Sequence, residues 1–345
     1  MQMPTLDKFP RKVLAKVDIQ TAFMVSRLVI AAERLQVFRL LNGREMTASA
    51  IARALKIHEY YLKPFLNSLV SVGLLRTFKD TYSNTGFTKH YFIDERAIYW
   101  TRQYSKECVN SYKALTLLEK SLASGKDYTT LKHLKVPSYI EAMTRNPGEA
   151  EDFTQMLFYR HQDVAKALAR FLDLSKRHSL LDVAGGSGVM SIALAKKNPH
   201  LRVSILDIAA VCKIATGNIR RARLSGRVST LPGDIREPLP EGFDAIMFCD
   251  IGVVSKQLLM NAYRSLPPYG LVVLVDRYMC KEGTNPLERL AHHFVGSSFG
   301  LETWVDMVER LKSCGFEAVR ARNVYRDVWF ITGVKPASPN RRGRV

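Results

Sequence analysis

The sequence has few cysteines, no cysteine pair at metal-ligand spacing, and no apolar run long enough to cross a bilayer. Its five cysteines lie far apart and form no CxxC pair, which excludes a disulfide framework or a zinc knuckle. We therefore expect reduced thiols and no bound metal. The longest apolar stretches, such as residues 270–275, have the length of a strand, whereas a spanning helix needs about 20 residues. The first 18 residues mix charged and apolar side chains without a cleavable leader. These absences predict a cytoplasmic protein.

Acidic residues are in deficit, with 32 Asp and Glu against 51 Lys and Arg, for a net charge of +19. Such a surplus favours anionic partners, nucleic acid among them. The charge is spread along the chain, with +10 in residues 1–150 and +9 in the remainder, which is typical of a solvated surface rather than of a binding stripe. With 345 residues, of which 47% are hydrophobic, the chain has room for two globular domains.

The first hundred residues follow the order helix, helix, helix, hairpin. Apolar side chains at helical spacing predict one long helix over residues 18–41. Thr47 is a candidate N-cap for a second helix, and His58 begins a third that Gly73 ends. Two short strands follow, joined by a turn near Lys79. This order is typical of a winged helix.

The third of these helices carries a single basic residue, Lys63, beside Tyr60, Tyr61 and Asn67. A helix that reads DNA usually makes more phosphate and base contacts than these side chains offer. DNA binding is therefore the less favoured interpretation. We predict instead that this mainly α winged-helix domain packs and dimerises through its apolar helices.

From residue 179 onward apolar strands alternate with helices, and the last two strands are close enough to pair as a hairpin. This alternation predicts an α/β fold, with a Rossmann-like, doubly wound and mostly parallel seven-stranded sheet that ends in an antiparallel C-terminal hairpin. We expect four segments in all. They are the winged-helix domain (1–105), a helical connector that contributes to a substrate pocket (106–175), a cofactor-binding domain (176–336) and a disordered basic tail (337–345).

The strongest motif is LLDVAGGSG at residues 180–188, an apolar strand that runs into a glycine-rich turn before a helix. Such a turn brings backbone N–H groups close to a ligand. The spacing Gly186-x-Gly188-x-x-Ser191 approximates the dinucleotide fingerprint, and Asp207 ends the next strand 19 residues after Gly188. NAD is therefore one ligand to weigh.

Acidic residues near the ends of three successive strands favour S-adenosylmethionine over NAD. Asp182 would repel a pyrophosphate and suits a ligand that carries ammonium and sulfonium charges. Asp207 is placed to bind ribose hydroxyls, and Asp234 with Ile235 is suited to an adenine amino group and the face of its ring. Ligands of such sheets bind where the carboxyl ends of the strands meet. We predict that the three carboxylates gather around one bound sulfonium nucleoside.

The segments AAERLQVFRLL, TASAIARAL and LNSLVSVGLL, followed by LLDVAGGSG, resemble the class I S-adenosylmethionine-dependent small-molecule O-methyltransferase family, which includes acetylserotonin, caffeate and polyketide enzymes. The resemblance covers roughly residues 18–336. It implies methyl transfer to oxygen or carbon of a small aromatic or acidic acceptor, by a homodimer formed through the N-terminal domain. It also implies a set of cofactor-binding residues: Asp182, Gly185, Gly186, Gly188, Asp207, Ile208, Asp234, Ile235 and Cys249. The family usually has glycine at the position of Ala184, so we expect that residue to keep a negative φ.

The residues that the family uses to remove a proton are missing. Ungapped alignment places Val253 where the family has its histidine base and Arg277 where it has an acid. No histidine occurs between His200 and His292. His292 and His293 are the candidate catalytic residues, although neighbours on a helix cannot both face one pocket.

Three residues are candidates for contact with the acceptor: Tyr159 and His161, on the helix that leads to the sheet, and Arg277, which would steer a substrate carboxylate. An acidic phenol or an activated carbon would need little help in losing its proton. Two alternatives stay open. One is a cofactor-binding but non-methylating relative, as among the anthracycline hydroxylases, and the other is a winged-helix DNA-binding regulator.

Overall fold

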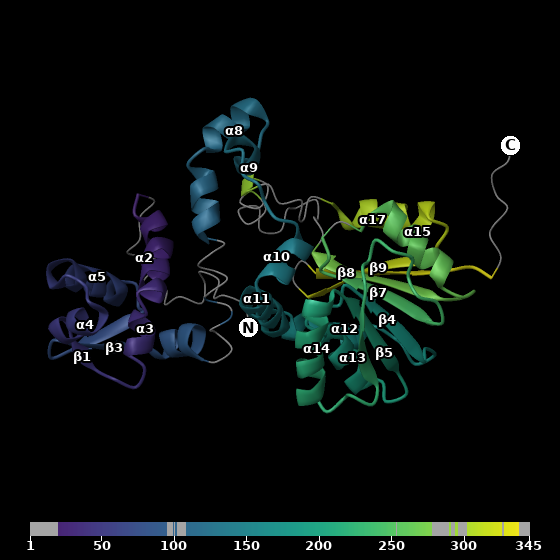
Figure 1. The fold of residues 1–345 in the computed structure, drawn as a ribbon, viewed down its shortest axis with the longest axis horizontal. Coiled ribbons are helices and arrows are strands. Elements are labelled where there is room, and N and C mark those ends of the chain that lie inside the picture. The colour runs from purple at the N-terminus through teal and green to yellow at the C-terminus, as the bar shows by residue number, and fades with distance from the viewer. Residues whose placement is uncertain are drawn as a thin grey trace. The chain divides into compact units, whose positions relative to one another are not determined.

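The computed structural model describes residues 20–94, 99, 101, 108–252, 254–277, 290, 294–295, 302–325 and 328–337. They form two compact units, which divide between Tyr112 and Lys113 (Figure 1). Within the described part of the chain, no helix is both long enough and apolar enough to cross a membrane.

The N-terminal unit combines short helices with a small antiparallel sheet of strand order β1-β3-β2. Thr47 caps the helix that follows it, since its hydroxyl accepts a hydrogen bond from the N–H of Ala50 at 3.2 Å. Lys79 and Asp80 form the hairpin turn with φ of 45° and 60°, the left-handed pair that a two-residue hairpin requires. Both features were predicted. The elements are α2 (Ala22–Arg34), α3 (Val37–Leu40), β1 (Met46–Thr47), α4 (Ala48–Leu55), α5 (Glu59–Ser71), β2 (Leu75–Phe78), β3 (Thr81–Asn84), α6 (Gly86–Thr88) and the π-helix η2 (Lys89–Ile93).

The prediction of one long helix over residues 18–41 is wrong, because the segment is broken between α2 and α3. Gln36 has φ 61°, a left-handed conformation that ends a helix. The break turns Val37 and Phe38 into the core of this unit, where both are at most 2% exposed. Apolar periodicity continues across such a break, so the pattern alone did not reveal it.

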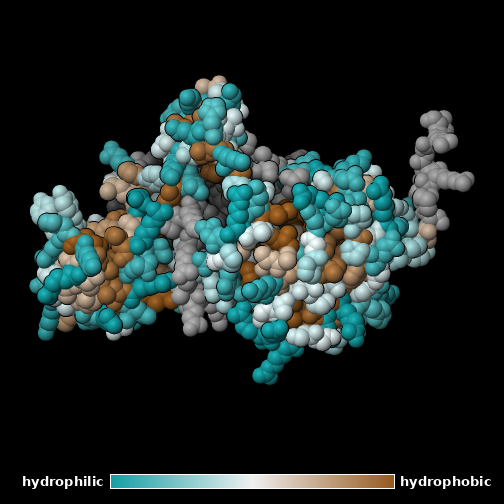
Figure 2. All heavy atoms as spheres, viewed as in Figure 1, coloured by the Kyte–Doolittle hydropathy of each residue, from teal (hydrophilic) through white to brown (hydrophobic). Residues whose placement is uncertain are grey.

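Large apolar side chains remain on the surface of the N-terminal unit. Phe23 is 60% exposed and Met24 46% exposed on α2, and Phe78 is 67% exposed on β2. Figure 2 shows apolar surface among the mostly hydrophilic residues of this unit. Single exposed apolar side chains are common, whereas adjacent ones such as Phe23 and Met24 can form part of an interaction surface.

The C-terminal unit contains the predicted seven-stranded sheet, in the order β6-β5-β4-β7-β8-β10-β9. The first five strands of this order run parallel, and the C-terminal hairpin is antiparallel. The doubly wound α/β prediction is confirmed. The strands are β4 (Ser179–Val183), β5 (Arg202–Asp207), β6 (Val228–Pro232), β7 (Ala245–Cys249), β8 (Leu271–Arg277), β9 (Glu317–Tyr325) and β10 (Val328–Val334).

Helices cover both faces of this sheet (Figure 1). On one face lie α12 (Gln162–Phe171), α13 (Val189–Lys197) and α14 (Ala209–Arg221), and on the other lie α15 (Lys256–Ser265) and α17 (Trp304–Ser313). Each face buries its own apolar cluster, as strands enclosed on both sides require. The preceding segment is helical, as predicted, with α8 (Leu118–Ser124), α9 (Tyr128–Leu131), α10 (Tyr139–Arg145) and α11 (Pro147–Arg160).

The order of the strands reverses at β4. The chain moves from β4 outward through β5 to β6, and then returns to pair β7 with the opposite edge of β4. In open sheets of this kind ligands bind outside the carboxyl ends of the strands at the reversal. The glycine-rich turn follows β4, so the fold places it at this point.

Candidate active site

Tight packing explains two of the glycines in the turn after β4. A Cβ on Gly185 would lie 2.6 Å from Cγ of Asp182 and 2.9 Å from Cγ2 of Ile205. A Cβ on Gly188 would lie 2.8 Å from Cδ1 of Ile205, and this residue also has φ 75°. Gly186 has φ 54°, and the nearest atom to a Cβ added there would be the carbonyl oxygen of Ala184 at 4.0 Å. Internal packing therefore requires glycine at positions 185 and 188, and at Gly186 the backbone carries no side chain to obstruct a ligand.

Ala184 departs from the expected backbone. We expected a negative φ from the sequence, but the residue has φ 53°. Its N–H donates to the carbonyl of Leu206 at 2.8 Å, so the bond to the neighbouring strand holds this conformation. The expectation was wrong because the turn needs a left-handed residue here whether or not it is glycine. An alanine in this region carries a strain of about 1 kcal/mol.

Asp182 lies beneath the glycine turn and is fully buried. Its Oδ2 accepts a hydrogen bond from the Ser191 hydroxyl at 2.5 Å, and its Oδ1 has no partner among the residues that the structure describes. Burial, helped by the negative charge of Asp207, raises the pKa of Asp182 to about 7, although the Ser191 hydrogen bond opposes the change. The carboxyl group therefore supports the turn from below, where burial opposes its ionisation.

Asp207, the last residue of β5, is tied to the same turn. Its Oδ2 accepts the N–H of Gly186 at 2.8 Å, and its Oδ1 accepts the N–H of Ile208 at 2.8 Å. Burial raises the pKa of Asp207, while these two N–H donors lower it. Each carboxylate oxygen has a second lone pair, which leaves it able to accept a ligand hydroxyl as well.

Asp234 follows β6, next in the sheet. Its carboxylate accepts hydrogen bonds from Nε of Arg236 at 2.9 and 3.0 Å, and this guanidinium lowers the pKa of Asp234 to about 2. The preceding residue, Gly233, donates its N–H to the carbonyl of Asp207 at 2.9 Å. Ile235 is partly buried beside it. The three aspartates therefore lie near the carboxyl ends of three adjacent strands, although their contacts with a cofactor stay a prediction.

A second cluster of charged residues lies near the carboxyl ends of β7 and β8. Nε2 of His161 is 3.2 Å from Oδ2 of Asp250, which directly follows β7. Asp276 and Arg277 end β8, and the N–H of Arg277 donates to Oδ1 of Asp276 at 2.7 Å. Burial and then the negative charge of Asp250 raise the pKa of Asp276 well above its usual range.

Cys249 connects the two clusters. Desolvation raises the pKa of its thiol, and the negative charges of Asp250, Asp182 and Asp276 raise it further. Carboxylates from β4, β7 and β8 therefore surround a single residue at the reversal point. Burial and mutual repulsion oppose the ionisation of these carboxyl groups, so a cationic ligand would stabilise their charged forms, whereas an anionic one would not.

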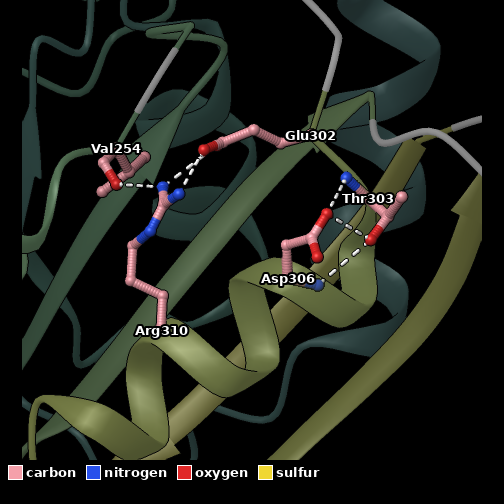
Figure 3. Close-up of polar contacts among 5 residues, drawn as sticks. All are labelled: Val254, Glu302, Thr303, Asp306 and Arg310. Atoms are coloured by element: carbon pink, nitrogen blue, oxygen red, sulfur yellow. Dashed lines mark hydrogen bonds and ion pairs between the residues drawn. The ribbon is translucent and has the colours of Figure 1, made fainter.

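Arg310 anchors the loop after β7 from the face of the sheet that α15 and α17 cover. Arg310 of α17 donates to the carbonyl of Val254 at 2.8 Å and pairs with the carboxylate of Glu302 (Figure 3). Thr303 and Asp306 cap the start of the same helix reciprocally, as Figure 3 shows. The guanidinium thus links two loops near the carboxyl edge of the sheet.

The structure brings only some of the predicted catalytic and acceptor residues together. His161 and Arg277 both belong to the cluster around Asp250. Tyr159 lies on α11, with its ring edge-on to that of Phe158 at 5.5 Å. Val253, His292 and His293 lie outside the described residues. The pairing of His161 with Asp250 was missed, because 89 residues separate the two in sequence.

Two family models match the chain. An O-methyltransferase domain matches residues 117–299, and an O-methyltransferase dimerisation domain matches residues 17–93. This chain belongs to the O-methyltransferase family. The prediction of a methyltransferase with a family dimerisation domain is therefore confirmed.

Individual relatives agree with the family. The chain is 25% identical to a 3-hydroxy-5-methyl-1-naphthoate 3-O-methyltransferase of Streptomyces sahachiroi, over 95% of this chain and 93% of the relative. It is 30% identical to an L-tyrosine C(3)-methyltransferase of Streptomyces lavendulae, over 55% of each chain. The solved mitomycin 7-O-methyltransferase has the same fold, with a TM-score of 0.80, 19% identity, and coverage of 92% of this chain and 96% of that one.

Proposed function

We propose that this methyltransferase transfers the methyl group of S-adenosylmethionine to a hydroxyl of a small aromatic acceptor that carries a carboxylate. The observation that carries the proposal is the glycine-rich turn with Gly185, Gly186 and Gly188, which lies against the carboxyl groups of Asp182 and Asp207. Such a site suits a ligand with ammonium and sulfonium charges and repels a pyrophosphate.

The residues present fit this cofactor. Its sulfonium supplies the electrophilic methyl carbon. Gly185, Gly186 and Gly188 form the turn to which we assign the methionine part, and Asp207 retains acceptor capacity for the ribose hydroxyls. Asp234 and Ile235 lie at the next strand end, where we assign the adenine. Ile208 and Cys249 complete the cofactor-binding residues of the proposal.

Arg277 supports an acceptor with a carboxylate. It ends β8 beside Asp276, in the cluster that includes His161 and Asp250. Two relatives act by name on aromatic acceptors that carry a carboxylate: one methylates a hydroxynaphthoate at oxygen, and the other methylates L-tyrosine at carbon. A guanidinium binds a carboxylate through paired hydrogen bonds, which also orients the ring that bears it.

We also propose that the chain works as a homodimer through its N-terminal unit. The dimerisation model matches residues 17–93, and apolar Phe23 and Met24 are exposed on α2 within that range. Sedimentation equilibrium of the full chain tests this directly. A dimer is expected, with weaker association in Phe23→Glu, and a monomer at micromolar concentration would contradict the proposal.

Calorimetric titration with S-adenosylmethionine, and in parallel with NAD, tests the cofactor. We expect a single site for the sulfonium ligand and no heat with NAD, and the reverse result would overturn the assignment. Transfer of a deuteriomethyl group from labelled cofactor to salicylate, hydroxynaphthoates, tyrosine and 2-naphthol, followed by mass spectrometry and NMR, then tests the reaction. Transfer to carbon, or cofactor binding without any transfer, would contradict O-methylation.

Arg277→Gln tests the acceptor class. We expect a roughly 10-fold or greater rise in KM for carboxylated acceptors, because a charge-assisted pair contributes about 1.5–3 kcal/mol. The KM for neutral 2-naphthol serves as the internal control and is expected to stay unchanged. An equal change for both acceptors would mean that Arg277 acts on the shape of the site rather than on a carboxylate.

A further inference from the structure

The segment that leads to the sheet breaks at His161. The sequence reads as one helical run, but α11 ends at Arg160 and α12 begins at Gln162, with His161 at φ −94° and ψ 7° between them. Its N–H donates to the carbonyl of Leu157 at 3.0 Å, and its carbonyl accepts the N–H of Ala165 at 2.8 Å. Hydrogen bonds on both sides therefore fix the backbone that carries the imidazole.

The imidazole lies at the carboxyl end of β7. Nε2 is 3.2 Å from Oδ2 of Asp250, and the His161 side chain is only 11% exposed. Asp250 is itself held in a left-handed conformation with φ 53°, and its N–H donates to the carbonyl of Val275 at 2.9 Å. Because β7 pairs with β4, this histidine and carboxylate lie next to the strand that leads into the glycine turn.

We propose that His161 is the base that takes the proton of the acceptor hydroxyl, and that Asp250 orients its imidazole. The inference rests on the proposed methyl transfer to oxygen. As the acceptor oxygen forms its bond to the methyl carbon, the carbon–sulfur bond breaks and its electron pair stays on sulfur. The hydroxyl proton passes to the imidazole of His161 and from there to solvent.

The charges around His161 fit this role. Burial lowers the pKa of His161 to about 4, Arg160 and Arg277 lower it as well, and the Asp250 carboxylate raises it. At neutral pH the ring is therefore unprotonated and ready to accept a proton. Once it is protonated, the imidazolium faces the carboxylate of Asp250, with Asp276 in the same cluster. A histidine paired in this way with a carboxylate keeps one orientation while its charge changes.

His161→Gln tests the proposal on acceptors of graded acidity, from unsubstituted phenols to nitrophenols of similar shape. Loss of a positioned base lowers kcat by about 10²–10⁴-fold. We expect this loss for the least acidic phenols and a progressively smaller loss for more acidic ones, which ionise without help. Raising the pH through the acceptor's own pKa should likewise restore much of the variant's rate. Cofactor affinity should stay within about twofold.

His200→Gln is the matched control. His200 precedes β5 at the opposite edge of the sheet, with Nε2 3.2 Å from the carbonyl of Leu174. The His200→Gln substitution should leave kcat unchanged. Asp250→Asn is a second test, which keeps the size of the side chain at Asp250 but removes its charge, and we expect a smaller loss in kcat with the same dependence on acceptor acidity.

The outcomes separate this inference from the proposed function. Suppose that the native chain methylates phenols. If His161→Gln is then fully active, or if its kcat falls by the same factor for every acceptor, the base assignment is wrong but the proposed methyl transfer is unaffected. If the native chain binds the cofactor but methylates no oxygen, both are wrong. If His161→Gln does not fold, the rate dependence of Asp250→Asn on acceptor acidity decides, and a uniform loss overturns the proposal.

Discussion

Asp182→Asn should change how the stability of this protein depends on pH. The native carboxyl has a pKa of about 7 against a usual 3.8, so the folded chain retains a proton that the unfolded chain loses between these values. The contribution of this group to the free energy of unfolding is therefore fully present below about pH 4, decreases as the pH rises toward 7, and is lost above it. Asparagine does not titrate, so the variant does not lose this stability as the pH rises.

The size of the effect follows from the two pKa values. Their difference corresponds to about 4 kcal/mol, at about 1.4 kcal/mol for each pKa unit. Part of that loss has already occurred at pH 5. Between pH 5 and pH 8 the free energy of unfolding of Asp182→Asn should therefore rise relative to the native chain by about 2–3 kcal/mol. The asparagine carbonyl can still accept from Ser191, so the hydrogen bond itself is conserved.

Urea unfolding at constant ionic strength, at pH 5, 6, 7 and 8, measures this difference. Asp306→Asn is the control, because the Thr303 hydrogen bonds lower the pKa of Asp306 and the group stays ionised across this range. The difference in free energy of unfolding between Asp306→Asn and the native chain should not change with pH. A flat difference for Asp182→Asn as well, or one that shrinks as the pH rises, would refute the argument that burial of this carboxyl opposes its ionisation.

Three further substitutions test the packing around the site by urea unfolding. Gly185→Ala should lower the free energy of unfolding by about 1–3 kcal/mol and weaken cofactor binding, because its Cβ would overlap the Asp182 carboxyl group. Arg310→Gln should lower it by about 1–3 kcal/mol, since the side chains of Arg310 and Glu302 are only 24% and 25% exposed. Ala184→Gly should leave it unchanged or raise it by up to about 1 kcal/mol, because relief of the left-handed strain offsets the added chain entropy.

Each of these substitutions has a control elsewhere in the same unit. Gly217→Ala in α14 meets no atom within 4 Å and should stabilise by about 1 kcal/mol. Lys312→Gln removes an ion pair whose side chains are 54% and 65% exposed, and should cost about 0.5 kcal/mol or less. Ala195→Gly in α13 should cost about 1–2 kcal/mol, because it lowers helix propensity and removes a fully buried methyl group. If a substitution at the site and its control changed the free energy of unfolding equally, local packing at the site would not be the cause of the change.

Local patterns predicted most elements because each depends on neighbours in sequence. Thr47 caps its helix, Lys79 and Asp80 turn the hairpin, and Gly73 follows the end of α5 with φ 73°. The breaks at Gln36 and His161 escaped prediction, because apolar spacing continues through both. The left-handed φ of Ala184 also escaped, since it depends on a hydrogen bond to β5.

The sequence by itself determined the order of strands and helices, the glycine turn and the acidic strand ends, because period and spacing are local properties of the chain. Tertiary structure alone decided what those residues face. It buried Asp182 beneath the turn, where desolvation raises its pKa, and it brought His161 to Asp250 across 89 residues. Burial and distant pairing depend on how helices pack on the sheet, and no local pattern contains that information.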